Sequence, residues 1–358
     1  MTEKPNLSRG AGHNPANRFE KIHLERDAEW NPEEDPALNT QFLRDKTSTI
    51  IAYNDSPDVG FEASVNPYRG CEHGCIYCYA RPTHEYLGFS VGLDFESRIM
   101  VKEDAPNLLR TELASPRWKP KVIAMSGVTD PYQPVERRLK LTRGCLQVLA
   151  EFRNPVAIIT KNNLVTRDID LLGELASHQA AAVFVSVTTL DTELRKVMEP
   201  RTSPPAARLA AVKALAQAGI PTGVLIAPVL PGLTDHEMPS ILCAAAEAGA
   251  RFAGYVTLRL PYAVAPLFEQ WLERHFPDKK EKVLNRIRSL RDGKLNDAQF
   301  GSRMRGEGIF ADQMEALFEV ARRKAAITER SPDLSTAAFR RPGAEQLTLS
   351  MALPGRDV

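Results

Sequence analysis

The run CEHGCIYC at residues 71–78 places three cysteines within one short loop, and no fourth cysteine stands near it. A structural zinc ion ordinarily takes four protein ligands, and a closed cubane iron–sulfur cluster takes four thiolates. Three thiolates on a cubane leave one iron without a protein ligand, so this iron can bind a small molecule through oxygen and nitrogen. The loop therefore predicts a reactive metal centre, with Cys71, Cys75 and Cys78 as its ligands.

A zinc site with three cysteines and one histidine is the competing interpretation of this loop, with His73 or His84 as the fourth ligand. The ligand pairs of a structural zinc site are usually separated by a longer loop, which disfavours zinc here. The remaining cysteines, Cys145 and Cys243, lie in helical patterns. Both are predicted to be buried, unreactive thiols.

The composition is that of a soluble globular protein: 358 residues, 43% of them hydrophobic and 25% charged. A formal net charge of +1 predicts no strong overall attraction to polyanions, although residues 276–358 carry 16 Lys and Arg against 12 Asp and Glu. A solvated helical face explains that local excess better than a nucleic-acid surface does. The sequence shows no signal-peptide core and no apolar run of membrane length, and its few, clustered cysteines fit a reducing cytoplasm.

Short apolar, β-branched runs separated by helical patterns begin at about residue 57. Six of them are predicted strands, at residues 61–67, 121–127, 156–161, 182–188, 222–228 and 253–258. This alternation favours a parallel sheet with helical crossovers, either a partial (β/α)6 TIM-type barrel or an open doubly wound sheet. The absence of a glycine-rich phosphate loop argues against a dinucleotide-binding sheet, so the partial barrel is the predicted α/β fold.

The chain divides into three predicted parts. Residues 1–56 form a polar N-terminal extension, partly disordered or wrapped on the core, and residues 57–275 form the barrel. Residues 276–358 form a helical C-terminal region and tail, within which residues 300–306 are predicted to be a flexible basic stretch.

The spacing of the three cysteines, with an aromatic residue before the last one, resembles the cluster loop of the radical S-adenosylmethionine superfamily. The loop also follows the first predicted strand, where that superfamily places it. More narrowly, Cys75-Ile76-Tyr77-Cys78-Tyr79 resembles the branch that contains spore photoproduct lyase and its uncharacterised "DNA repair photolyase-like" relatives. The resemblance covers roughly residues 57–260.

This resemblance implies a [4Fe-4S] cluster and S-adenosyl-L-methionine as cofactors. The reduced cluster would cleave S-adenosylmethionine to methionine and a 5′-deoxyadenosyl radical, and this radical would abstract hydrogen from the substrate. It further implies an electron donor of the flavodoxin or ferredoxin type, and a lyase or transferase reaction. The substrate is left open between a small molecule and a nucleic acid.

The same resemblance assigns roles to residues at the carboxyl ends of successive strands, where barrel active sites gather. Ser126 and Gly127 would approach the amino group of the methionine moiety, and Lys161 would pair with its carboxylate. Ser186 would contact the ribose or methionine part, and the backbone of Tyr77 would meet the adenine. The competing interpretation of Lys161 and Ser186 is an ordinary polar strand end.

One departure from the lyase pattern bears on the reaction. The lyase has a cysteine two residues before the serine, which returns a hydrogen atom to the product radical, whereas this chain has Ala124 followed by Met125. Tyr79 matches a tyrosine implicated in radical transfer and is the predicted catalytic residue. A tyrosine-based route is therefore expected in place of thiol-based repair of a thymine dimer.

The alternative functional class is a non-catalytic iron–sulfur or zinc protein that acts as an interaction module in DNA repair or replication. Residues 346–349 (QLTL) resemble the short peptide by which bacterial proteins dock weakly on the replication sliding clamp. That peptide usually ends in phenylalanine, which this chain lacks, so a frayed tail is the favoured interpretation.

Overall fold

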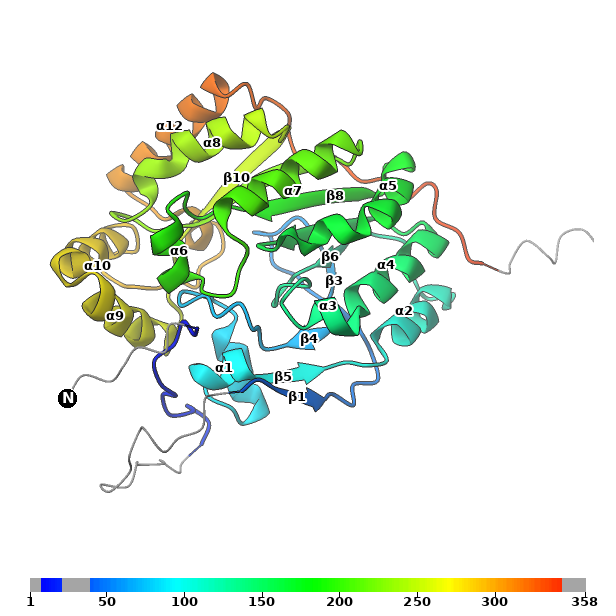
Figure 1. The fold of residues 1–358 in the computed structure, drawn as a ribbon, viewed down its shortest axis with the longest axis horizontal. Coiled ribbons are helices and arrows are strands. Elements are labelled where there is room, and N and C mark those ends of the chain that lie inside the picture. Colours follow the sequence, from blue (N-terminus) through cyan, green and yellow to red (C-terminus); the bar gives the residue numbers. More distant parts are fainter. Residues whose placement is uncertain (1–7, 21–38, 343–358) are drawn as a thin grey trace, which may run out of the picture.

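The computed structural model describes residues 8–20 and 39–342. Its centre is a seven-stranded sheet in the order β10-β9-β8-β7-β6-β3-β2, in which six strands are parallel and β2 pairs antiparallel with β3 (Figure 1). In chain order the strands are β2 (Ile51–Tyr53), β3 (Ala63–Val65), β6 (Ile123–Met125), β7 (Val156–Thr160), β8 (Ala181–Ser186), β9 (Thr222–Val229) and β10 (Phe252–Thr257). All six predicted strands are confirmed, each within two residues at its outer ends.

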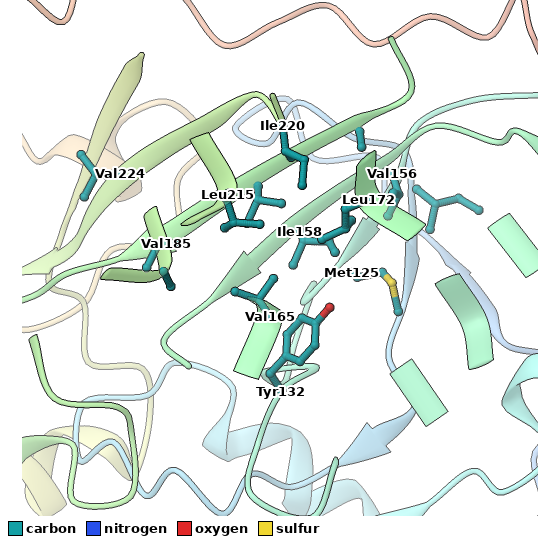
Figure 2. Packing of buried hydrophobic residues seen from close by; sticks show 14 of the residues in the cluster. Met125, Tyr132, Val156, Ile158, Val165, Leu172, Val185, Leu215, Ile220 and Val224 are labelled. Atoms are coloured by element: carbon teal, nitrogen blue, oxygen red, sulfur yellow. The ribbon is translucent and has the colours of Figure 1, made fainter. Parts of the chain in front are cut away.

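The strands are buried because their apolar side chains meet helices. Helices α2 (Ala105–Ala114), α4 (Leu141–Phe152), α5 (Ile169–Ser177), α7 (Pro205–Gln217) and α8 (Met238–Glu247) connect successive parallel strands. Figure 2 shows Ile158 of β7 and Val185 of β8 in one layer with Leu172 of α5 and Leu215 of α7, all fully buried. Because a parallel sheet between crossover helices exposes little of either face, its strands are the continuous apolar runs that made them predictable.

Short helices complete the connections and mark the edge where strands end. They are η1 (Arg81–Leu87), α1 (Leu93–Ser97), α3 (Glu136–Leu139), η2 (Asn163–Asp168), α6 (Thr192–Met198) and η3 (Asp235–Glu237). The start of α6 is set by Asp191, whose carboxylate accepts hydrogen bonds from the backbone N–H groups of Glu193 (2.8 Å) and Leu194 (3.1 Å).

A second, three-stranded sheet was not predicted. It has the order β1-β5-β4, with β1 (Gln41–Arg44), β4 (Tyr68–Arg69) and β5 (Arg98–Val101). β1 and β4 contain at most two consecutive apolar residues, so no apolar run indicates them in the sequence. β1 and β2 both lie within the predicted N-terminal extension, so part of that extension belongs to sheets; the three-part division of the chain itself stays a prediction.

The described chain after β10 is helical, whereas the predicted boundary at residue 276 stays a prediction. This part comprises α9 (Val264–His275), η4 (Pro277–Lys279), α10 (Lys280–Ser289), α11 (Ser302–Arg305) and α12 (Ile309–Lys324), and α12 lies along α8 (Figure 1). The stretch predicted to be flexible contains α11 and is tied to the β2–β3 loop: Asp58 forms an ion pair with Arg303 and accepts the backbone N–H of Gly301 at 2.6 Å. Across the described residues, no helix is both long and apolar enough to cross a membrane.

Candidate cluster and cofactor site

The cysteine loop follows β3 and β4 and lies at the carboxyl edge of the parallel strands. Its backbone is held from several directions: Cys71 N–H donates to Phe95 O (2.9 Å) and Ile76 N–H donates to Met198 O (3.1 Å). The side chain of Gln133 accepts the N–H of Glu72 at 3.0 Å. The loop conformation is therefore fixed by the surrounding chain before any metal binds.

The N-terminal segment lies directly behind this loop, which the sequence did not reveal. A Cβ atom on Gly10 would lie only 1.7 Å from Gly74 O, so the two backbones pass too closely for any other residue at Gly10. The buried carboxylate of Glu96 fixes this contact by accepting the N–H groups of Gly10 (2.9 Å) and Ala11 (2.8 Å) and a hydrogen bond from Arg81 (2.5 Å). Arg81 also donates to Cys75 O at 3.0 Å, which joins the loop to the same cluster of contacts.

The three thiols suit a cubane better than a single metal ion. Cys71 and Cys75 are buried and Cys78 is half-buried, and burial raises the pKa of each thiol. Bound iron would displace these protons, because a coordinating thiol is deprotonated outright. In the part of the chain that the structure describes, no three His, Cys, Asp or Glu side chains converge as ligands of one ion do. A cubane takes each thiolate on a different iron, so its ligands stand apart, and these residues fit it.

The histidines proposed for the zinc alternative are placed for other roles. His73 is buried, with Nδ1 3.4 Å from Asp130 Oδ2 and Nε2 3.1 Å from Asn162 Nδ2, so both ring nitrogens are already engaged. His84 packs between the rings of Phe89 and Phe95, and burial lowers its pKa to about 4. This arrangement favours a cluster over zinc.

The other two cysteines differ from each other. Cys145 is buried in α4, as predicted, but Cys243 is exposed on α8, so the prediction for Cys243 was wrong. An alanine-rich helix has no distinct apolar face, and the sequence gave no sign of which positions turn to solvent.

Ser126 and Gly127 follow β6, and their backbone passes close to the side chain of Ser64 on β3. Ser126 has φ = +102°, a value that L-residues rarely adopt, and such strain concentrates at functional sites. A Cβ atom on Gly127 would lie 2.9 Å from Ser64 Oγ, so a larger residue there would push the Ser64 side chain aside. The carbonyl of Gly127 accepts a hydrogen bond from Tyr79 OH at 3.0 Å, which links this strand end to the cysteine loop.

Lys161 follows β7 and is already fully hydrogen-bonded. An ammonium group has three N–H donors, and here they meet Thr188 Oγ1 (2.9 Å), Ala227 O (2.8 Å) and Glu199 Oε1 (3.2 Å). The predicted contact with a substrate carboxylate thus requires Lys161 to exchange one of these acceptors.

Glu199 is the residue at this site that sequence reasoning missed. Its fully buried carboxylate accepts hydrogen bonds from Tyr77 OH and Arg208 in addition to its ion pair with Lys161. Burial alone would raise its pKa, but the charges of Arg208 and Lys161 hold the pKa well below the ordinary value of a glutamate. Tyr77 and Lys161 lie far from it in the sequence, and no local motif connects it to Arg208, so the sequence did not identify it.

The same network reaches the two remaining predicted cofactor residues. Arg208 donates to the carbonyl of Ser186 at 3.0 Å, and Tyr77 OH also lies 3.4 Å from Thr188 Oγ1. The structure therefore brings Tyr77, Lys161 and Ser186 together around Glu199. Ser126 and Gly127 meet Tyr79 instead, on the other side of the cysteine loop.

Two acidic residues after β6 act as structural anchors. Asp130 accepts hydrogen bonds from Thr160 Oγ1 and from the backbone N–H of Lys161, both at 2.7 Å, and so fixes where β7 ends. Glu136 is buried and accepts the N–H of Thr142 at 3.0 Å in the first turn of α4. These contacts assign both residues a structural role.

Tyr79, the predicted catalytic residue, is accessible. Its side chain is 47% exposed, and the guanidinium carbon of Arg259 lies 4.8 Å from its ring centre. Ala124, which stands where the lyase has its hydrogen-donating cysteine, is buried within β6.

Comparison with known proteins agrees with this geometry. A sequence profile of the Radical SAM superfamily matches residues 65–242. The chain is 40% identical over 232 residues to an uncharacterised protein of Mycobacterium tuberculosis, covering 64% of this chain and 67% of that protein. It is 30% identical over 227 residues to an uncharacterised protein of Methanocaldococcus jannaschii, covering 63% and 81%.

The fold is similar to that of spore photoproduct lyase complexed with dinucleoside spore photoproduct, with a TM-score of 0.55 and 16% identity over 79% of each chain. This similarity confirms the predicted α/β class and barrel architecture. Three cysteines in a loop at the strand ends, the profile match and the identity to the archaeal protein lead to one conclusion. The chain belongs to the radical S-adenosylmethionine superfamily.

Proposed function

We propose that the protein binds a [4Fe-4S] cluster through Cys71, Cys75 and Cys78 and uses it to cleave S-adenosyl-L-methionine reductively. The observation that carries this proposal is the placement of the three-cysteine loop beside the ends of β6, β7 and β8, where Ser126, Lys161 and Ser186 lie. When bound, the cluster and S-adenosylmethionine supply a 5′-deoxyadenosyl radical, which abstracts hydrogen from the substrate.

The chain's own residues bind and orient the cofactor. Glu199 and Thr188 hold the ammonium of Lys161 in place, and the carboxylate of the methionine moiety would displace one of the three acceptors. Ser126 and Gly127 follow the end of β6, and Ser126 has a positive φ. Their backbone groups and the Ser126 hydroxyl would bind the amino group of the methionine moiety. Gly10 and Ala11 cover the back of the loop, which limits access of water from that side.

The reaction is proposed to be of lyase or transferase type, with a nucleic acid as the candidate substrate and a small molecule as the alternative. Support for nucleic acid comes from the lyase of similar fold, whose structure holds a dinucleoside photoproduct. Ala124 cannot return a hydrogen atom as a thiol does, so the final hydrogen atom is assigned to the phenol O–H of Tyr79. One electron from the external donor and one proton from solvent would convert the resulting phenoxyl radical back to the phenol. Binding to single-stranded and duplex DNA or RNA should weaken steeply with salt; absent or salt-independent binding would exclude a nucleic acid.

Anaerobic reconstitution tests the core of the proposal. The protein is loaded with iron and sulfide, reduced with dithionite in the presence of S-adenosylmethionine, and assayed for 5′-deoxyadenosine by chromatography. Cys78→Ala is the negative control and Cys145→Ser, on a buried thiol outside the loop, is the matched positive control. Product at the level of Cys78→Ala would refute radical chemistry.

The alternative is a cluster protein without catalysis, which would show cluster absorption but no change of its electron paramagnetic resonance spectrum on addition of S-adenosylmethionine. Sliding-clamp docking by residues 346–349 lies outside the described residues and rests on sequence alone. A pull-down of the clamp with the full chain and with a chain ending at residue 342 tests it directly.

A further inference from the structure

Arg259 stands at the carboxyl end of β10 in a fixed position. The backbone N–H of Leu258 donates to Val229 O at 3.0 Å, and the buried Arg291 donates twice to Leu258 O, at 2.7 and 3.1 Å. These bonds hold the chain on the amino-terminal side of Arg259. Its side chain is therefore presented from a rigid strand end and not from a loose loop.

The guanidinium of Arg259 lacks an anionic partner. Within residues 8–20 and 39–342 it makes no hydrogen bond or ion pair, although its side chain is half-buried. Among the described residues, the buried Arg208 and Arg81 pair with Glu199 and Glu96, and the buried Arg291 and Arg195 donate to backbone carbonyls instead. Arg259 has neither kind of partner there. Burial lowers the pKa of Arg259 and the nearby Arg303 lowers it further, which is the electrostatic result of leaving this cation uncompensated.

The neighbouring charged residues do not neutralise the positive charge of Arg259. Asp58 already forms an ion pair with Arg303, and Ser56 accepts a further hydrogen bond from Arg303. Arg303 and Arg259 are thus close neighbours that share the field of one carboxylate.

The position of Arg259 ties it to the reaction site. Its guanidinium carbon lies 4.8 Å from the ring centre of Tyr79, the residue after Cys78, and Tyr79 OH donates to Gly127 O. The Tyr79 ring and the neighbouring Val128 (37% exposed) are open to solvent, so a ligand can reach this corner. A guanidinium has a planar fork of donors that matches phosphate and carboxylate oxygens.

We propose that Arg259 is the receptor for an anionic group of the substrate, a phosphate or a carboxylate, which it holds beside Tyr79. This inference rests on the proposed function, because it names the substrate class of the same site. A substrate held there would place its reactive carbon between the cluster loop and the strand ends of β6 and β10.

The experiment compares Arg259→Met and Arg259→Lys with Arg251→Met. Arg251 immediately precedes the same strand at its opposite end and pairs with Glu329 at the surface, so it controls for the loss of one positive charge. Inorganic phosphate is followed by phosphorus-31 relaxation and carbon-13-labelled acetate by carbon relaxation. The cluster-loaded protein is used with S-adenosylmethionine present and reductant absent, and circular dichroism checks that each variant is folded.

The wild type should bind one of the two anions, and Arg259→Met should bind it about tenfold or more weakly. Arg259→Lys should retain part of the affinity, and Arg251→Met should match the wild type. Dependence on Arg259 for phosphate indicates a phosphate-bearing substrate, and dependence for acetate alone indicates a carboxylate. Equal relaxation in wild type and Arg259→Met for both anions, or an equal loss in Arg251→Met, would overturn the inference.

Failure of the proposed radical chemistry would give a different result from failure of the Arg259 site. If the wild type releases no 5′-deoxyadenosine under reducing conditions while anion binding still depends on Arg259, the radical chemistry falls and the anion site stands. If it releases 5′-deoxyadenosine but neither anion depends on Arg259, only the present inference falls.

Discussion

Replacing Glu199 by glutamine should destabilise the protein strongly. The carboxylate is fully buried and neutralises Arg208 and Lys161, so the variant leaves buried positive charge without its partner. Breaking a buried ion pair from one side costs about 3–5 kcal/mol of unfolding free energy. An unfolding entropy of about 2.1 cal/mol/K per residue, over 358 residues, converts this to a fall in melting temperature of about 4–7 °C.

The assay is urea and thermal unfolding of the metal-free protein, followed by far-ultraviolet circular dichroism. Glu193→Gln is the matched control, because Glu193 is 78% exposed and pairs only with Lys196 one helical turn away. That control should change stability by less than about 0.5 kcal/mol. The double variant Glu199→Gln/Arg208→Met should lose less stability than the two single variants lose in total, because it also removes the arginine that Glu199→Gln leaves without a partner. A melting temperature for Glu199→Gln within about 1 °C of wild type would refute the assignment of Glu199 as the electrostatic centre of the site.

Three further outcomes follow from the same contacts. The folded-state pKa of Glu199 is depressed, so the unfolded state takes up more protons in acid. The stability that Glu199 provides is therefore complete above pH of about 4.3 and declines below it. Acid unfolding curves should fall less steeply in Glu199→Gln than in wild type. Glu96→Gln turns one of the two oxygens that accept from Gly10 and Ala11 into an NH2 donor, so one of these hydrogen bonds is lost and the other is weakened. Brief trypsin digestion should then cut at Arg9 or Arg18 faster than in the exposed control Glu103→Gln; equal cutting rates would contradict the role of Glu96. Maleimide should label Cys243 rapidly and Cys145 only on unfolding, as mass spectrometry of the labelled peptides can show; protection of Cys243 in the folded protein would count against its exposed placement.

Sequence reasoning located the barrel strands because burial on both faces leaves a readable apolar run, as at residues 156–160 and 181–186. It located the cysteine loop because all three thiols come from one short stretch. The second sheet was missed because its strands owe their existence to pairing with distant segments, as β1 pairs with β5, and not to their own composition.

The supports of the site were missed for a related reason. Glu199 and Glu96 look like ordinary surface glutamates in the sequence, and only folding brings Arg208 and Lys161 to one and the backbone of Gly10 to the other. The role proposed for Arg259 could not be predicted from the sequence, because it depends on the fold placing no carboxylate within ion-pair distance of its guanidinium among the described residues.

The charges at the strand ends divide the site into two unlike halves. On the side of β7 and β8, Glu199 compensates one of the two positive charges of Lys161 and Arg208, which leaves a net charge of +1 there. The methionine moiety of S-adenosylmethionine carries an ammonium, a carboxylate and a sulfonium group. Its carboxylate would pair with the remaining charge when it displaces one acceptor of Lys161. On the side of β10, Arg259 is uncompensated and stands beside an exposed aromatic ring. A neutral ligand would leave that cation unpaired, whereas an anionic one would neutralise it, so the charge distribution favours the proposed anionic substrate group on this side.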